Sequence, residues 1–212
     1  VLAAGQVMLS AGTSWVLFFP EPDRDLLVRQ ALLCDPFLHR NGFWGGMASI
    51  EAVSRKIDRL IRRWISDRAD CLDTFTKLAR QAPAGASGLI IRPDLADEAS
   101  DFSGHSRPDI ARALMEGTAF LLAARLEQLK RVGIQAESLT MVGGAARNAV
   151  WAEIVCNVFG KPVTVIGDAF SGAVGAAIVA GCGVGAFADE QTAARQIQQQ
   201  HTRLLPDQKI HE

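Results

Sequence analysis

The stretch LTMVGGAARNAVWAEIVCNVFGKPVTVIGD, residues 139–168, decides the fold of this 212-residue chain. Its opening residues, Leu139 to Val142, predict a buried strand, and apolar residues at helical spacing predict a helix over 150–158. Gly160 is a typical residue at the end of a helix, and Val163 to Ile166 predicts a second buried strand. A strand, a helix and a further strand in this order indicate an α/β protein.

The turn between the first strand and the helix reads Gly143-Gly144-Ala145-Ala146-Arg147-Asn148. Two glycines at the end of a strand leave bare backbone amides at a helix N-terminus, where phosphates and ribose hydroxyls can be bound. Paired glycines also serve simply to tighten such a turn, and this alternative stays open. The dinucleotide fingerprint G-x-G-x-x-G is not matched at this turn, and no G-x-x-x-x-G-K-[ST] loop is present. A phosphate bound here is therefore bound by another arrangement.

A second turn with glycine lies near the start, in GQVMLSAGTSWVLFFP, residues 5–20. Val7 to Leu9 and Trp15 to Phe19 predict the arms of a β-hairpin, but its turn is Gly12-Thr13-Ser14 rather than Asn-Gly or Asp-Gly. The glycine allows a ligand to approach closely, and the amides and two hydroxyls can donate to phosphate oxygens. We predict that this hairpin turn and the Gly-Gly turn form two sides of one phosphate site.

The composition is that of a globular protein with a sizeable core, because 49% of its residues are hydrophobic. Its 22 basic and 23 acidic side chains give a net charge of −1, which favours a small ligand over nucleic acid or an anionic membrane surface. The four cysteines form no C-x-x-C pair and are expected to be reduced core thiols, as in a cytoplasmic protein. No metal-ligating residue is assigned, since the four histidines are not at metal-ligand spacing.

Two further helices are expected upstream of these strands. A polar loop over Glu21 to Arg40 precedes apolar residues that recur at helical spacing from Ile50 to Trp64, whose arginines are expected to form a solvated face. A long buried helix is predicted from the capping residue Ser106 to a C-cap at Gly133. Inside it, Gly117 is expected to pack closely against a neighbour, and Glu116 is expected to pair with Arg112 one turn earlier.

The segment from Ala169 to Ala188 carries no charge over about the length that spans a membrane. It is rich in alanine and glycine and has acidic rather than basic or aromatic flanks. We expect a buried helix of small residues, and no membrane partner. The N-terminus, VLAAGQVMLS, does not resemble a signal peptide, and it suggests a chain that starts within a fold.

The motifs GQVMLSAGTSW, GGMAS, RALMEGTAF, MVGGAARNAVWAEIVCNVFGKPV and GAVGAAIVAG occur in this order along nearly the whole chain. Together they resemble the C-terminal half of the FGGY carbohydrate kinases, the group that contains xylulokinase, glycerol kinase and gluconate kinase. The resemblance implies an actin-like ATPase lobe of the ribonuclease-H-like type, with a mixed central sheet flanked by helices. Such a lobe forms one side of a nucleotide cleft between two lobes.

The resemblance also implies the binding residues for ATP with Mg²⁺. The turn of Gly12, Thr13 and Ser14 is expected to contact the terminal phosphates, and the turn of Gly143, Gly144 and Ala145 the ribose and α-phosphate region. Arg147 and Asn148 then lie beside the purine. The helix over 172–181 is expected to pack by its small residues under the nucleotide.

The resemblance assigns residues 1–212 to the C-terminal nucleotide-binding lobe alone. The N-terminal lobe, with the sugar-binding residues and the aspartate that acts as general base, is expected upstream of Val1. No catalytic residue is assigned here, and this chain by itself is expected to bind nucleotide without transferring phosphate to a sugar or polyol. The sugar and the oligomeric state stay open, a homodimer included.

Three departures from the family pattern affect these expectations. Ile50 stands where a glycine is usual, which puts the access of adenine in question. The loop over 91–109 is shorter than usual and lacks an arginine-proline-tryptophan pattern, which suggests an unusual acceptor sugar. Asn157 replaces a frequent aspartate, and we expect a structural role for it.

Two other functions are kept as alternatives. A non-catalytic nucleotide-binding or regulatory module would use the same fold without the chemistry. An NAD-binding α/β domain is suggested by the strand, Gly-Gly turn, helix and strand with Asp168 beyond them, although the fingerprint is not matched.

Overall fold

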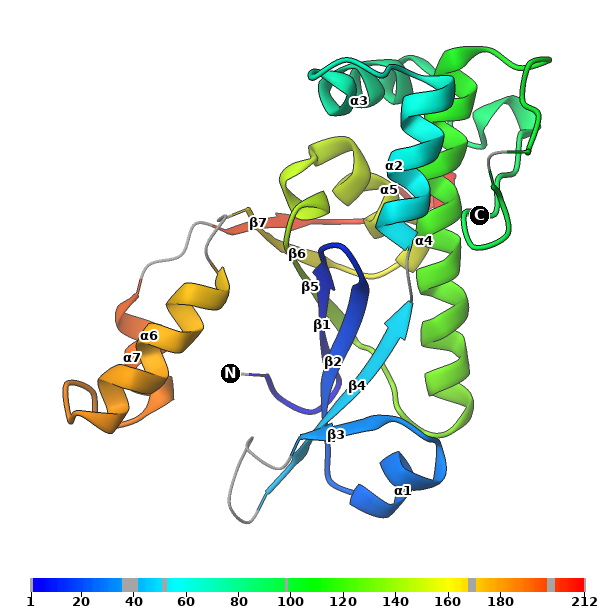
Figure 1. The fold of residues 1–212 in the computed structure, drawn as a ribbon. Helices are drawn as coiled ribbons and strands as arrows, with labels where there is room; N and C mark the ends of the chain where they lie inside the picture. Colours follow the sequence, from blue (N-terminus) through cyan, green and yellow to red (C-terminus); the bar gives the residue numbers. More distant parts are fainter. Residues whose placement is uncertain are drawn as a thin grey trace.

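A computed structural model describes residues 2–35, 42–50, 53–97, 99–167, 171–197 and 201–211 of the chain. A seven-stranded mixed sheet in the order β3-β4-β2-β1-β5-β6-β7 forms its centre, flanked by helices (Figure 1). The strands are β1 (Gln6–Ala11), β2 (Trp15–Glu21), β3 (Leu33–Asp35), β4 (Trp44–Ile50), β5 (Ser138–Val142), β6 (Val163–Ile166) and β7 (His201–Leu204). The α-helices are α1 (Arg24–Arg29), α2 (Val53–Trp64), α3 (Cys71–Gln81), α4 (Arg107–Arg131), α5 (Ala149–Phe159), α6 (Ser171–Gly183), α7 (Glu190–Gln196) and α8 (Gln208–His211). Two short 3-10 turns are η1 (Ala86–Gly88) and η2 (Ala145–Arg147). This architecture confirms the predicted α/β class and the mixed sheet.

The predicted hairpin is present as β1 and β2, which pair antiparallel with Ala11 opposite Trp15. On its other edge β1 pairs with β5 in parallel, with Ser10 beside Val142, and β5 pairs in parallel with β6. The carboxyl ends of these three parallel strands therefore lie at one edge of the sheet. The hairpin turn and the Gly-Gly turn both leave the sheet at this edge.

One face of the sheet carries the core. Alternate residues of β1, Val7, Leu9 and Ala11, are at most 2% exposed, and the same alternation buries Leu139 and Met141 of β5. The long helix α4 packs against α2, α3 and α5, and these helices contribute to the same continuous apolar core. The intervening strand residues, such as Met8 and Thr140, are only half-buried.

The predicted long helix is α4. Its N-cap is Ser106, whose hydroxyl accepts the amide of Asp109, and the left-handed Gly133, with φ +95°, follows its C-cap residue Val132. A Cβ on Gly117 would lie 2.1 Å from the carbonyl oxygen of Ile91, which confirms the expected close packing.

The Glu116 carboxylate is 8% exposed, and it accepts hydrogen bonds from Nε of Arg112 at 2.7 Å and from the amide of Gly85 at 3.0 Å. The ion pair expected within the helix is therefore present. Through the bond to Gly85 it also ties α4 to the loop that contains η1.

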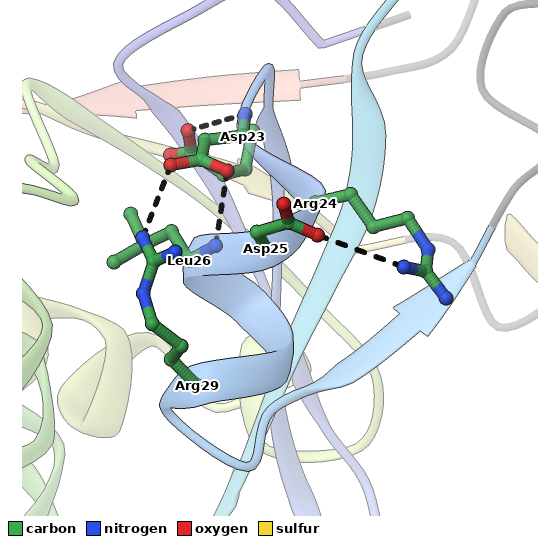
Figure 2. A network of polar contacts seen from close by, with 6 residues as sticks. Asp23, Arg24, Asp25, Leu26 and Arg29 are labelled. Atoms are coloured by element: carbon green, nitrogen blue, oxygen red, sulfur yellow. Dashed lines mark hydrogen bonds and ion pairs between the residues drawn. The ribbon is translucent and has the colours of Figure 1, made fainter.

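The expectation of a polar loop over Glu21 to Arg40 is wrong in the part that the structure describes. Asp23 caps α1 by accepting the amide of Leu26 at 3.0 Å, which holds the pKa of this carboxyl below its ordinary value of 3.8 (Figure 2). Arg29 closes on the same carboxylate at 3.3 Å, and Arg24 and Asp25 form a further exposed pair. These local contacts turn a polar sequence into a short helix that buries Leu27 and leads into β3. Residues 36–41 lie outside the described residues.

Ile50 is the last residue of β4 rather than the first of a helix, and α2 begins at Val53. Sequence periodicity missed β4 because glycine is disfavoured in strands. Here the glycines are required, since a Cβ on Gly45 would lie 2.7 Å from the ring of Phe18, and one on Gly46 would lie 2.4 Å from the ring of Phe19. The exposed arginine face predicted for this helix is present in α2.

The prediction of a buried helix after β6 is wrong for α6, since none of its residues is buried. Figure 1 shows α6 and α7 as a pair that stands apart from the sheet. The glycine and alanine side chains of α6 offer little apolar area to bury. Its close contact is with the segment that leads to α7, because a Cβ on Gly181 would lie 2.6 Å from the ring of Phe187. Within the described ranges, no helix is both long and apolar enough to cross a membrane.

Candidate nucleotide site

The Gly12-Thr13-Ser14 turn is accessible at the end of β1. Thr13 and Ser14 are exposed, and neither hydroxyl has a hydrogen-bond partner among the described residues. A residue of α2 anchors the turn, because the hydroxyl of Ser54 donates to the carbonyl oxygen of Gly12 at 2.5 Å. Two free hydroxyls therefore stand on a turn whose backbone is anchored.

The Gly-Gly turn lies next to it at the end of β5. Gly143 has φ +95°, a left-handed conformation, and a Cβ there would lie 2.9 Å from the carbonyl oxygen of Ala11. Only glycine fits, because both the conformation and the contact with the backbone of β1 exclude a side chain. This contact places the Gly-Gly turn directly beside the residue that precedes the hairpin turn.

Gly144 differs from its neighbour. It is exposed, has right-handed helical torsion angles of φ −59° and ψ −45°, and begins the 3-10 turn η2. The amides of Ala146, Arg147 and Asn148 donate back to carbonyls of the turn at 3.1–3.2 Å. The first amides of a helical turn have no partner inside it, so those of Gly144 and Ala145 are available to a ligand.

Asn148 caps α5, which follows the turn. Its side-chain oxygen accepts the amide of Trp151 at 3.2 Å, and its side-chain nitrogen donates to the Thr76 hydroxyl on α3 at 2.7 Å. Both polar atoms of the side chain are thus engaged. The contacts hold the start of α5, and with it the Gly-Gly turn, against α3.

A cavity of about 630 Å³ opens beside η2 and the start of α5. This volume lies within the range of small-molecule sites. Arg147, which the sequence singled out, lines the cavity and is exposed. The other predicted site residues are not among its described lining residues: Gly12, Thr13, Ser14, Gly143, Gly144, Ala145 and Asn148. The described residues that line it are Ala146, Arg147, Ala149, Ala152, Glu153, Val165, Gly167, His201, Thr202 and Leu204.

Sequence reasoning missed most of this lining. Glu153 lies one turn after Ala149 on α5, so helical spacing from the Gly-Gly turn could have found it. His201 and Thr202 come from β7, which reaches the cavity by pairing antiparallel with β6. No local pattern in the sequence signals that pairing.

Ile50 is half-buried and lies opposite Trp15 in the sheet, close to the hairpin turn. Asn157 accepts the amide of Asp207 at 2.9 Å, which supports its structural role. In the part of the chain that the structure describes, no group of three or more His, Cys, Asp or Glu side chains could hold a metal ion.

The fold resembles those of solved sugar kinases. Xylulose kinase from Rhodospirillum rubrum matches 99% of this chain and 44% of its own with a TM-score of 0.80 at 22% identity. Glycerol kinase from Plasmodium falciparum, solved with ADP, matches 98% of this chain and 44% of its own with a TM-score of 0.72 at 16% identity. The chain therefore has the actin-like ATPase fold of these proteins.

Residues 7–184 match the C-terminal domain of the FGGY family of carbohydrate kinases. The chain belongs to this family. An autoinducer-2 kinase from Enterobacter sp. (strain 638) is 28% identical over 89% of this chain, and an L-fuculokinase from Salmonella typhi is 34% identical over 63% of it. The chain spans 40% and 29% of the lengths of these two relatives, respectively.

Proposed function

We propose that this chain is the nucleotide-binding lobe of an ATP-dependent carbohydrate kinase. The observation that carries the proposal is the meeting of two glycine turns at the carboxyl edge of β1 and β5, beside a cavity of about 630 Å³. Ligands of open α/β sheets bind outside the carboxyl ends of their strands. Membership of a carbohydrate kinase family and a fold shared with an ADP-bound glycerol kinase support the nucleotide as the ligand.

The residues at this edge suit the parts of ATP in order. Amides and hydroxyls of Gly12, Thr13 and Ser14 donate to the terminal phosphates, and such bonds to charged oxygens are stronger than neutral ones. The bare amides of Gly144 and Ala145 donate at the ribose and α-phosphate, where the helical turn adds a favourable dipole.

The base then enters the cavity beside Arg147. Asn148 acts at this end by holding the turn, since both polar atoms of its side chain are already bonded inside the protein. Mg²⁺ binds through the phosphates with few protein ligands, which suits an edge where no acidic cluster is described.

Bound ATP supplies the phosphoryl group that a sugar or polyol hydroxyl accepts. The chain's part is to hold the phosphates in place, and positioning is the main protein contribution to phosphoryl transfer. We place the sugar site and the general base in a preceding domain and assign no catalytic residue within residues 1–212.

Isothermal titration of the chain with Mg-ADP and, separately, with NAD tests this function. We expect ADP to bind and NAD to give no heat of binding. Binding of NAD without ADP would favour a dinucleotide domain, and binding of neither would contradict the site. A non-catalytic module of the same fold would also bind ADP, and it is distinguished by the absence of sugar-dependent ATP consumption in the full-length protein.

A further inference from the structure

Two tryptophans link the two turns of the site. Trp15 is the first residue after the hairpin turn and is 1% exposed, while Trp151 lies in the first turn of α5 and is 7% exposed. Their ring centroids are 5.8 Å apart at an interplanar angle of 48°. Aromatic pairs at this distance attract each other beyond their buried area. The Trp15 ring therefore packs against α5, the helix that follows the Gly-Gly turn.

The Trp151 ring is held in its orientation by α4 and α3. Its Nε1 donates to the hydroxyl of Thr118 at 2.8 Å, and that hydroxyl donates in turn to the carbonyl oxygen of Met115 at 2.6 Å. Thr118 is fully buried at 0% exposure, so water cannot replace it as the acceptor. Phe75 of α3 meets the same indole edge-on at a centroid distance of 5.8 Å.

We infer that Thr118 and Trp151 are positioning residues that set the separation of the two nucleotide-binding turns. This inference rests on the proposed function. The hydroxyl of Thr118 fixes the Trp151 ring, the ring fixes Trp15, and Trp15 fixes the hairpin turn relative to α5. Both residues are buried, Thr118 at 0% and Trp151 at 7% exposure, so they act through the turns rather than by touching the nucleotide.

The consequence is specific to ligands that need both turns. ADP carries a terminal phosphate for the hairpin turn and an α-phosphate for the Gly-Gly turn, whereas AMP reaches only the second. A shift between the turns therefore weakens ADP more than AMP, because losing one hydrogen bond to a charged phosphate oxygen lowers affinity by about tenfold or more. The ratio of the two affinities measures the alignment of the turns.

The test is Thr118→Val in the whole chain, with the dissociation constants of ADP and AMP measured by titration calorimetry. Valine matches the shape of threonine but leaves Nε1 of Trp151 without an acceptor. We expect the preference for ADP over AMP to fall by about tenfold, the effect of losing one hydrogen bond to a charged oxygen. Thr118→Ser, which keeps a hydroxyl, is expected to restore it. Leu129→Ala, a buried change farther along α4, should lower stability and leave the preference unchanged.

Trp151→Phe provides a second variant that also removes the buried donor. In that background Thr118→Val should have no further effect on the preference, since the hydrogen bond is already absent. A wild-type preference for ADP that persists in Thr118→Val would overturn the inference and leave the proposed function intact. Equal binding of ADP and AMP by the wild-type chain would overturn the inference and the role of the hairpin turn, while binding of neither would overturn the proposed function as well.

Discussion

Gly144 and its neighbour Gly143 allow ligand binding to be separated from folding. Gly144 has right-handed helical torsion angles, and a Cβ there meets nothing closer than the carbonyl oxygen of Ala11 at 3.9 Å. Gly144→Leu should therefore leave the free energy of unfolding within about 1 kcal/mol of the wild type, since it also removes backbone freedom from the unfolded chain. The same side chain covers the amides proposed to bind phosphate. Losing one such charged hydrogen bond costs about 1.5–3 kcal/mol, which is about a ten- to hundredfold rise in the Kd of ADP.

Gly143→Ala is the matched control with the opposite outcome. Its left-handed backbone costs a side chain about 1–2 kcal/mol, and the new Cβ would also lie 2.9 Å from the carbonyl oxygen of Ala11. We expect this variant to lose about 3 kcal/mol or more of stability. Thermal unfolding and titration with ADP measure both quantities for each variant. A folded Gly144→Leu chain with unchanged ADP affinity would refute the assignment of this turn to phosphate.

Three further predictions concern the site and the core. Thr13→Val should weaken ATP more than AMP in titrations, because the lost hydroxyl is the one proposed to donate to the terminal phosphates; equal losses would contradict that role. Glu116→Gln should lower stability in denaturant unfolding by about 3 kcal/mol, since it leaves Arg112 buried without its carboxylate, and an unchanged midpoint would show that the pair contributes little. Bonds from the hydroxyls of Ser106 and Ser87 hold the pKa of Asp109 below its ordinary value of 3.8, so its contribution is present above that pH and is lost as pH falls through the lower folded-state pKa. The stability of Asp109→Asn should therefore depend less on pH than that of the wild type when unfolding is measured from about pH 6 to about pH 2, which brackets the carboxyl pKa. Identical pH profiles for the two proteins would contradict this contribution of Asp109.

The sequence predicted the parts of the fold that local chemistry determines. The strand, Gly-Gly turn, helix and strand appear where the periodicity and punctuation put them, with Gly160 left-handed at the end of α5. The hairpin is present for the same reason. Local patterns were misleading where a tertiary contact decides, as in β4, whose glycines accommodate the rings of Phe18 and Phe19.

The candidate site divides in the same way. Gly143 could be recognised from the sequence, because its left-handed backbone and its close approach to Ala11 require glycine. At Gly12 and Gly144 a Cβ would meet nothing closer than 3.9 Å, so the fold itself does not require glycine there. The hydrogen bonds of Asn148 to Thr76 and of Trp151 to Thr118 join residues that are far apart in the chain, and no spacing rule reveals them. The burial expected of α6 was inferred from its composition, and composition does not specify the surface that a helix packs against.

The central claim is that both turns bind one nucleotide, and amide chemical shifts of the isotope-labelled chain titrated with Mg-ADP test it most directly. We predict that the amides of residues 12–14 and 143–145 shift together along one binding curve, while amides near Gly85, which is bonded to Glu116 of α4, stay in place. Shifts confined to one turn, or centred away from both, would contradict the account.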